Sequence, residues 1–138
     1  MIGLDTNILA RYFIDDEADA EATRQRVAAR RLMDGGEALM LCKTALLEFE
    51  WVMRGYYRFD RAQVQAVLQH LLAMPQLSIE ATDQVRQAVD LHADGFDLAD
   101  ALHHASYTEC QRLASFDDRG FARRAKRLGL VPTVFVPR

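Results

Sequence analysis

The chain has 138 residues, of which 50% are hydrophobic and 27% are charged. This length and composition indicate one globular domain over residues 1–138 and exclude collagen-like, low-complexity and disordered proteins. No apolar run approaches the roughly 18 residues that a membrane-spanning helix needs, so we expect no membrane partner. The opening Met-Ile-Gly-Leu reaches Asp5 without a basic flank, which predicts no signal peptide and a cytoplasmic location.

Charge is distributed unevenly along the chain. The net charge of −3 argues by itself against a nucleic-acid partner. Residues 111–138, however, hold seven basic side chains and two acidic ones, whereas the first 110 residues are strongly acidic. Such an asymmetry is typical of a chain with a basic surface for an acidic partner.

Apolar runs and helix signals alternate along the chain. The two patterns predict an α/β fold with a mainly parallel sheet flanked by helices. In chain order we expect a strand over Met1–Asp5, helices over Thr6–Phe13 and Ala18–Met33, a strand over Ala38–Cys42, helices over Thr44–Tyr57 and Asp60–Met74, a strand over Leu77–Ile79, helices over Thr82–Ala93 and Asp97–Gln111, a strand over Leu113–Phe116, a helix over Asp118–Leu128 and a strand over Val131–Val136.

Two acids directly follow predicted strands. Asp5 comes after Ile2-Gly3-Leu4, and Asp117 comes after Leu113–Phe116. In a doubly wound sheet, ligands bind beyond the carboxyl ends of the strands, where these two acids are expected. Aspartate is also a favoured helix N-cap, so capping of the next helix explains either position equally well.

Glu48 lies within a largely apolar helical segment. Its neighbours three and four residues away include Ala45, Trp51 and Val52, and no basic residue stands at either spacing. A carboxylate on an apolar face must be paired, protonated or metal-bound, unless that face is an edge and the group is solvated. Glu50, by contrast, has Arg54 four residues later and is expected to form a surface ion pair.

Asp97 and Asp100 open another helix, three residues apart. Both positions suit the helix dipole, with Asp97 as N-cap, and Asp100 alternatively points out at the carboxyl edge of the sheet. Asp5, Glu48, Asp100 and Asp117 come from four separate segments, and each falls at or near this edge. Converging carboxylates repel one another, and a divalent cation removes that cost. Oxygen-only ligands suit Mg²⁺ or Mn²⁺, which can activate water and stabilise charge on a phosphate under attack.

The cysteines and histidines form no recognisable metal-binding pattern. Cys42 and Cys110 make no CxxC pair and are expected to be small buried side chains. The four histidines lack the spacing of a zinc site and are expected to be structural or surface residues.

The chain as a whole resembles the PIN-domain ribonucleases, in particular the VapC-like toxins of type II toxin–antitoxin systems. The resemblance rests on four motifs in order: Ile-Gly-Leu-Asp5-Thr6-Asn7, Leu-Leu-Glu48-Phe-Glu-Trp-Val-Met-Arg, Phe-Asp97-Leu-Ala-Asp100-Ala-Leu-His, and Ser-Phe-Asp117-Asp118-Arg-Gly-Phe-Ala-Arg-Arg-Ala. It implies an α/β/α sandwich around a parallel sheet, and hydrolysis of RNA phosphodiesters by four acids that bind one or two Mg²⁺ or Mn²⁺ ions.

The resemblance also assigns individual residues and partners. Asp5 and Asp100 match the metal ligands, Glu48 and Asp117 complete the quartet, and Thr6 matches the hydroxyl residue that supports the first aspartate. The last motif departs from the commonest spacing. We favour Asp117 as the fourth acid and expect Asp118 to cap the following helix, although counting back from Phe121 favours Asp118. Asp97 is a fifth, outer acid or a cap. Family members form homodimers and are silenced by a cognate antitoxin.

Two further features bear on partners. Arg119, Arg123 and Arg127 share a helical spacing, so this basic stripe either contacts RNA phosphates, faces an acidic partner or is an ordinary solvated face. The helices Ala18–Met33 and Thr44–Tyr57 carry apolar side chains that serve either core packing or a dimer or antitoxin surface.

Three other functions compete with RNA cleavage. The first is a non-catalytic PIN-fold module that binds RNA or protein. The second is a receiver-type phospho-switch, which would require an acidic pair before the first helix and a late lysine after a strand; Asp5 stands alone, and neither Lys43 nor Lys126 follows a late strand. The third is DNA cleavage, because the metal chemistry does not require a 2′-hydroxyl.

Overall fold

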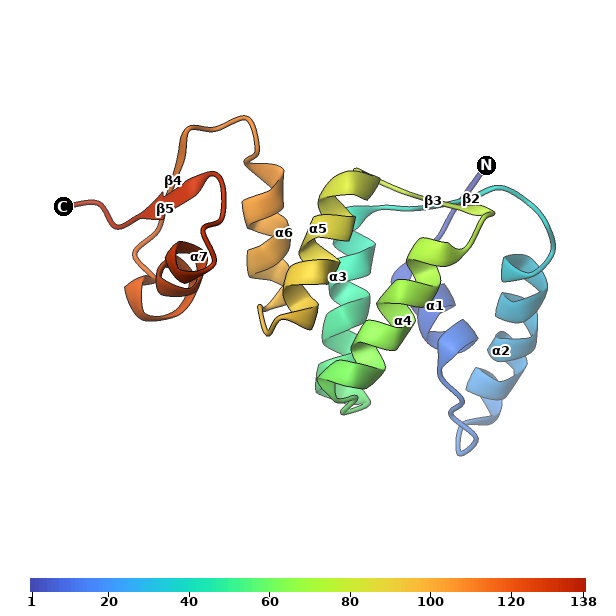
Figure 1. Ribbon diagram of the computed structural model, residues 1–138. Coiled ribbons are helices and arrows are strands. Elements are labelled where there is room, and N and C mark those ends of the chain that lie inside the picture. Colours follow the sequence, from blue (N-terminus) through green and yellow to red (C-terminus); the bar gives the residue numbers. More distant parts are fainter.

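The computed structural model describes residues 1–138 and has an α/β fold, as predicted (Figure 1). Five short strands alternate with helices, and every strand pairing is parallel. The strands are β1 (Ile2–Gly3), β2 (Leu39–Leu41), β3 (Leu77–Ile79), β4 (Arg112–Ala114) and β5 (Thr133–Phe135). The helices are α1 (Thr6–Phe13), α2 (Ala20–Met33), α3 (Lys43–Trp51), α4 (Arg61–Ala73), α5 (Thr82–Ala93), α6 (Leu98–Ser106) and α7 (Arg123–Arg127), with wider π-helical turns η1 (Val52–Tyr56) and η2 (Asp118–Ala122).

The strands form two sheets rather than one. The first has the order β1-β2-β3, with Leu39 opposite both Ile2 and Leu77. The second contains only β4 and β5, with Leu113 opposite Val134. In Figure 1 this second sheet lies with α7 at one end of the molecule, beyond α6. The expectation of parallel strands is confirmed, but their carboxyl ends do not form one continuous edge.

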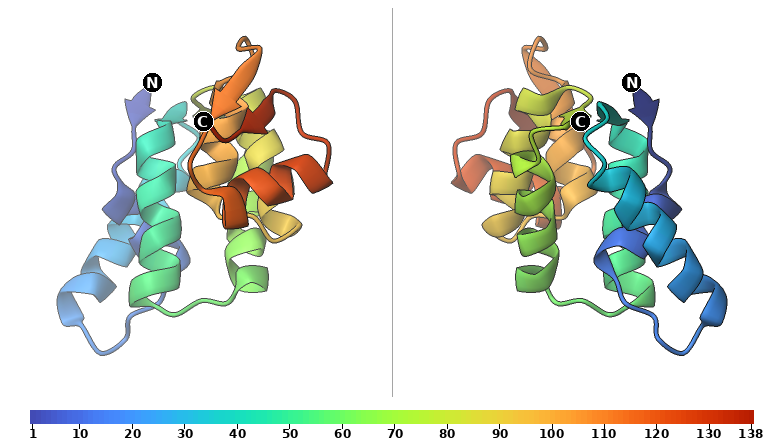
Figure 2. Two further views of the ribbon diagram at one scale, coloured as in Figure 1. Left: turned by 90° about the vertical axis from the view of Figure 1, so that its left-hand side faces the viewer. Right: turned by 90° about the vertical axis from the view of Figure 1, so that its right-hand side faces the viewer.

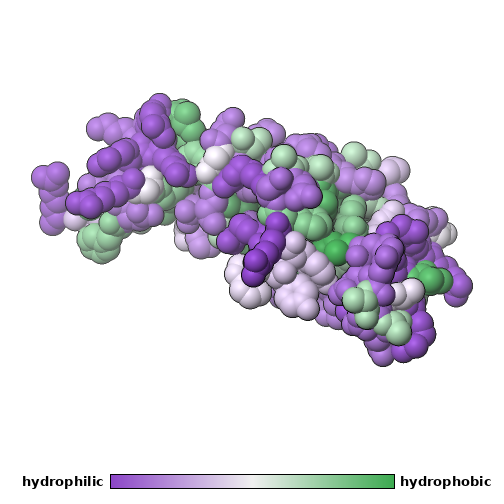
Figure 3. Space-filling view, turned by 90° about the horizontal axis from the view of Figure 1, so that it is seen from below, coloured by the Kyte–Doolittle hydropathy of each residue, from purple (hydrophilic) through white to green (hydrophobic).

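Helices pack around α3 in the middle of the molecule. Figure 2 shows α1 and α2 on one side of α3, and α4, α5 and α6 on the other. The core contains the fully buried Phe49 and Met53, together with Leu39 and Leu41 of the central strand β2. On the face seen in Figure 3, hydrophilic residues dominate and hydrophobic ones show only as separate patches. None of the helices is long and apolar enough to cross a membrane.

Side-chain caps explain where most helices begin. Asp5, Asp19, Asp60 and Asp97 are the N-caps of α1, α2, α4 and α6, and each carboxylate accepts a backbone N–H of the first turn. At α4 the Gln63 side chain also accepts the Asp60 N–H, which completes a capping box. The caps at Asp5, Asp60 and Asp97 agree with the predicted helix starts, whereas α2 begins after its cap Asp19, two residues later than the predicted start at Ala18.

Three predicted helices differ from the structure. The helix predicted over Thr44–Tyr57 changes at Val52 to a wider turn, in which the Tyr57 N–H reaches the Val52 carbonyl. The helix predicted over Asp97–Gln111 ends at Ser106, because the Tyr107 N–H bonds to the His104 carbonyl three residues back and closes the last turn. The helix predicted over Asp118–Leu128 is divided into η2 and α7.

Candidate active site

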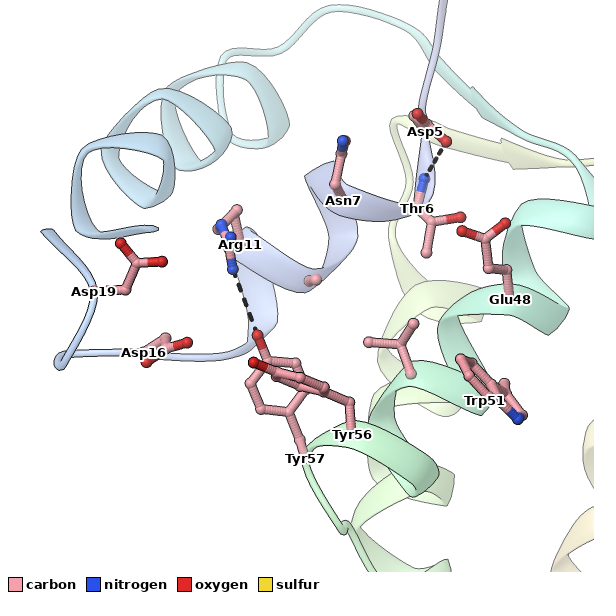
Figure 4. A pocket seen from close by; sticks show the side chains of 12 residues that line it. Asp5, Thr6, Asn7, Arg11, Asp16, Asp19, Glu48, Trp51, Tyr56 and Tyr57 are labelled. Carbon is pink, nitrogen blue, oxygen red and sulfur yellow. Dashed lines mark hydrogen bonds between the residues drawn. The ribbon is translucent and has the colours of Figure 1, made fainter. Parts of the chain in front are cut away.

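Asp5 and Glu48 meet at one pocket. Asp5 caps α1 and accepts the Thr6 N–H at 2.8 Å, while Glu48 projects from α3 toward Thr6 (Figure 4). Both acids line a cavity of about 370 Å³, which we call the N-terminal acid pocket. Its other lining residues include Asn7, Arg11, Asp16, Asp19, Trp51, Tyr56 and Tyr57. The pocket therefore combines carboxylates with aromatic side chains.

Thr6 connects the two helices that border this pocket. Its side chain is buried, and its hydroxyl donates to the Ala45 carbonyl of α3 at 3.5 Å. The group of Thr6 that contacts Asp5 is the backbone N–H rather than the hydroxyl expected from the family motif. Thr6 thus links the start of α1, and the carboxylate of its cap, to the helix that carries Glu48.

Asp100 and Asp117 meet at a second pocket, which we call the C-terminal acid pocket. They line a cavity of about 250 Å³ together with His103, Tyr107 and Ser115. The Asp117 carboxylate accepts the N–H groups of Gly120 at 3.0 Å and Phe121 at 3.3 Å. A Cβ atom at Gly120 would come within 2.8 Å of that carboxylate, so the close approach requires glycine.

Asp100 is a half-buried carboxylate close to two other acids. Burial raises the pKa of Asp100, and the nearby carboxylates of Asp97 and Asp117 raise it further, while His103 and Arg124 lower it by less. The two acids that increase its proton affinity come from the start of α6 and from the segment after β4. Local spacing supplies Asp97 and tertiary contact supplies Asp117, and together they produce the like-charge crowding that a divalent cation would relieve.

Asp97, Asp117 and Asp118 lie in different surroundings, which bear on whether each is a helix cap or a site acid. Asp97 caps α6 by accepting the Asp100 N–H at 3.1 Å. Asp117, not Asp118, caps the following helical turn, so the predicted cap at Asp118 is wrong. Asp118 lines a different cavity, between α7 and β5. Asp117 is the acid that shares a pocket with Asp100, and its place in the quartet stays a prediction.

The predicted quartet is thus arranged as two pairs. No group of three His, Cys, Asp or Glu side chains lies close enough together to hold one metal ion. The physical reason is the division of the sheet, because Asp5 follows β1 of the first sheet and Asp117 follows β4 of the second. Mg²⁺ retains several waters and is commonly bound by one or two carboxylates with substrate phosphates, so each pair suits that ion in donor type.

Glu48 and Glu50 lie in environments opposite to those that the sequence predicts. Glu48 is exposed, whereas Glu50 is buried to 6% exposure and accepts the Arg54 Nε–H at 2.9 Å. The predicted ion pair between Glu50 and Arg54 is confirmed. The prediction that this pair lies at the surface is wrong, because Glu50 is buried. Glu48 is a solvated carboxylate beside Asp5 rather than a charge on an apolar face.

The structure confirms some of the remaining side-chain predictions and contradicts others. Cys42 is half-buried and Cys110 is exposed, so the expectation of two buried cysteines is wrong. His92 and His104 are buried structural residues, bonded to Gln65 and to the Pro132 carbonyl, and His70 and His103 are on the surface, as expected. Phe49 belongs to the core, while Trp51 and Tyr56 are 62% and 73% exposed. The basic stripe Arg119, Arg123 and Arg127 is exposed.

Comparison with known families identifies the class of protein. The model of the PIN domain family matches residues 2–127, and the chain belongs to that family. PIN domains are generally nucleases that bind RNA and use divalent metal ions. A search of curated protein sequences gives no match.

Proposed function

We propose that this protein is a metal-dependent endoribonuclease and the VapC-like toxin of a type II toxin–antitoxin pair. Asp5, Glu48, Asp100 and Asp117 are the acids that carry hydrolysis of the RNA phosphodiester bond. The observation that supports this most directly is that Asp100 and Asp117, from separate segments, line one pocket, where burial and the carboxylates of Asp97 and Asp117 raise the pKa of Asp100. A family of nucleases that use divalent ions provides the chemical context.

The acid pockets have the donors that Mg²⁺ or Mn²⁺ prefers. Asp5 and Glu48 would supply carboxylate oxygens in the N-terminal acid pocket, and Asp100 and Asp117 would do so in the C-terminal acid pocket. A bound cation of this kind activates water and stabilises charge on the phosphate. The chain itself fixes the acids, since Asp5 and Asp117 are both held by backbone N–H groups.

As a VapC-like toxin, the protein would bind a cognate antitoxin and a second copy of its own chain. The exposed Trp51 and Tyr56 lie on the N-terminal acid pocket and offer aromatic surface to a cognate antitoxin or a homodimer partner. An antitoxin segment in that pocket would cover Asp5 and Glu48, which explains inhibition.

One observation favours a second function. Because no three potential ligands gather at one point, the protein also suits a non-catalytic PIN-fold module that binds RNA or protein. Such a module would bind single-stranded RNA and leave it intact with every divalent metal.

The two functions are separated by a cleavage assay. We expect the purified chain to cut a fluorescently labelled RNA in Mg²⁺ or Mn²⁺ and to stop in EDTA, and we expect Asp5→Asn and Asp100→Asn to be inactive. Full cleavage by both variants would exclude the four-acid mechanism. The toxin role is tested by expression in growing cells, where the unchanged chain should arrest growth and Asp5→Asn should not.

A further inference from the structure

A third pocket, separate from both acid pockets, gathers three arginines. Arg54 of η1, Arg61 at the start of α4 and Arg124 of α7 line a cavity of about 390 Å³. We call it the arginine pocket. The three residues lie far apart in the sequence, and the fold brings their guanidinium groups together. All three are exposed, so the cavity is open to a ligand from solvent.

Each guanidinium is held in place by only one of its nitrogens. Arg61 Nη1 donates to the carbonyls of His92 at 2.7 Å and Phe96 at 2.9 Å. Arg124 Nη1 donates to the Gly95 carbonyl at 2.9 Å, and Arg54 Nε donates to Glu50 at 2.9 Å. The other nitrogens of each group bond to nothing in the protein. Fixed arginines with free N–H donors are preorganised for an anion, because less side-chain freedom is lost on binding.

The charges around this pocket leave it positive. Its three arginines outnumber its two acids, Glu50 and Asp97, by one. Glu50 is the buried partner of Arg54, while the exposed Asp97 accepts the Asp100 N–H and keeps its charge. His92 adds no charge near neutral pH, since burial and the neighbouring Arg61 lower its pKa, with only weaker opposition from Glu50 and Asp97. The N-terminal acid pocket, by contrast, has four acids and only Arg11 as a base.

The arginine pocket adjoins the C-terminal acid pocket. Asp97 lines the arginine pocket and lies three residues before Asp100 on the first turn of α6. Asp117 caps η2, which continues directly into α7 and Arg124. A nucleic-acid strand that extends from Asp100 and Asp117 across the first turn of α6 would reach these guanidinium groups.

We propose that Arg54, Arg61 and Arg124 form an anion-binding pocket that takes a backbone phosphate of the substrate strand. The identity of that strand as RNA rests on the proposed function, while the anion site rests on the arginines alone. Arg119, Arg123 and Arg127, the basic stripe, form no ion pair or side-chain hydrogen bond within the protein and are the matched comparison.

The anion site is tested with inorganic phosphate and the unchanged chain. NMR signals of the arginine Nε–H groups are followed as phosphate replaces KCl at constant ionic strength. We expect saturable shifts at Arg54, Arg61 and Arg124, and none at Arg123 or Arg127. Equal shifts at all arginines, or none at the three, would overturn the proposal. This measurement needs neither catalysis nor a variant.

The RNA contact is tested by binding in EDTA, where metal-dependent cleavage is absent. Fluorescence anisotropy of a single-stranded RNA is measured from about 50 to about 300 mM KCl. We expect Arg124→Gln to weaken binding about tenfold and to reduce the salt slope by about 0.7, the value for one lost phosphate contact, with Arg123→Gln nearly unchanged. Thermal unfolding checks that both variants are folded.

Other results have distinct meanings. If Arg123→Gln reduces the salt slope and Arg124→Gln does not, RNA follows the basic stripe and the proposed RNA contact is wrong. If the unchanged chain binds RNA through the arginine pocket but cuts nothing in Mg²⁺ or Mn²⁺, the pocket stands and the nuclease function fails.

Discussion

The N-terminal and C-terminal acid pockets place similar carboxylates in different surroundings. In the first, Asp5 is a helix cap after the three-stranded sheet, and Glu48 is exposed on α3. In the second, Asp100 is half-buried beside two other acids, and Asp117 lies after the two-stranded sheet. Aromatic side chains line the N-terminal acid pocket, while arginines adjoin the C-terminal one.

This difference suggests a division of roles between the two pockets of the proposed nuclease. The C-terminal acid pocket has the crowded carboxylate that gains most from a cation, and it lies beside a positive pocket suited to a phosphate. The N-terminal acid pocket has four acids, one arginine and aromatic surface for a partner. The roles of the two pockets therefore depend on whether RNA cleavage needs both pairs of acids.

The largest expected effect is on catalysis. We expect Asp5→Asn and Asp100→Asn each to lower the rate of RNA cleavage by about 10²–10³-fold, because each removes a charge that the reaction needs. Both variants should stay folded, since asparagine is as good an N-cap as aspartate at position 5. The measurement is the initial rate with a labelled RNA in Mg²⁺. A loss in only one variant would assign catalysis to that pocket alone.

The next effect separates stability from function along one helix. We expect Glu50→Ala to reduce the free energy of unfolding by about 2 kcal/mol, since it removes a buried side chain and its charged hydrogen bond to Arg54. Glu48→Ala should change stability by less than about 0.5 kcal/mol but lower cleavage. Urea unfolding of both variants provides the comparison. Equal destabilisation would show that Glu48 has a structural role as well.

A smaller effect concerns the stability that the folded protein loses by holding the ionised Asp100 carboxylate near other acids. Because folding raises the pKa of Asp100, the folded chain holds that proton more tightly than the unfolded chain, and ionisation at pH 7 lowers stability. We therefore expect Asp100→Asn to raise the melting temperature in EDTA at pH 7. The gain should vanish at a pH acidic enough to protonate Asp100 in both states. A lower melting temperature at pH 7 would contradict this account.

The smallest expected effect is a pH dependence of stability at the arginine pocket, which His92 lines. Burial of His92, with Arg61 nearby, lowers its folded pKa, so the unfolded chain binds the proton more readily. Stability should therefore be complete above the unfolded pKa of about 6.5 and decrease as the pH falls below it. Urea unfolding between pH 7.5 and pH 5.5 measures this slope, and His92→Gln should make it shallower. An unchanged slope would assign the dependence to other groups.

Much of the local structure could be predicted because local physical chemistry specifies it. Thr6–Phe13, Leu77–Ile79 and Thr82–Ala93 have the predicted bounds, as expected where a cap or a chain-breaking turn stands at a boundary. The helix predicted to Gln111 ends at Ser106 because its last turn closes on the His104 carbonyl, a geometry that no residue type specifies.

The sequence by itself determined the α/β pattern, the family motifs and the acids that follow strands, since these depend on residue type and short-range spacing. Only the tertiary structure decided that Glu50 is buried and Glu48 exposed, that the four acids form two pairs, and that three distant arginines converge. Burial and charge convergence depend on which segments pack together, and no local spacing contains that information. The basic C-terminal segment shows both levels, because its composition indicated an anionic partner and its folding joined the exposed Arg124 to the Gly95 carbonyl.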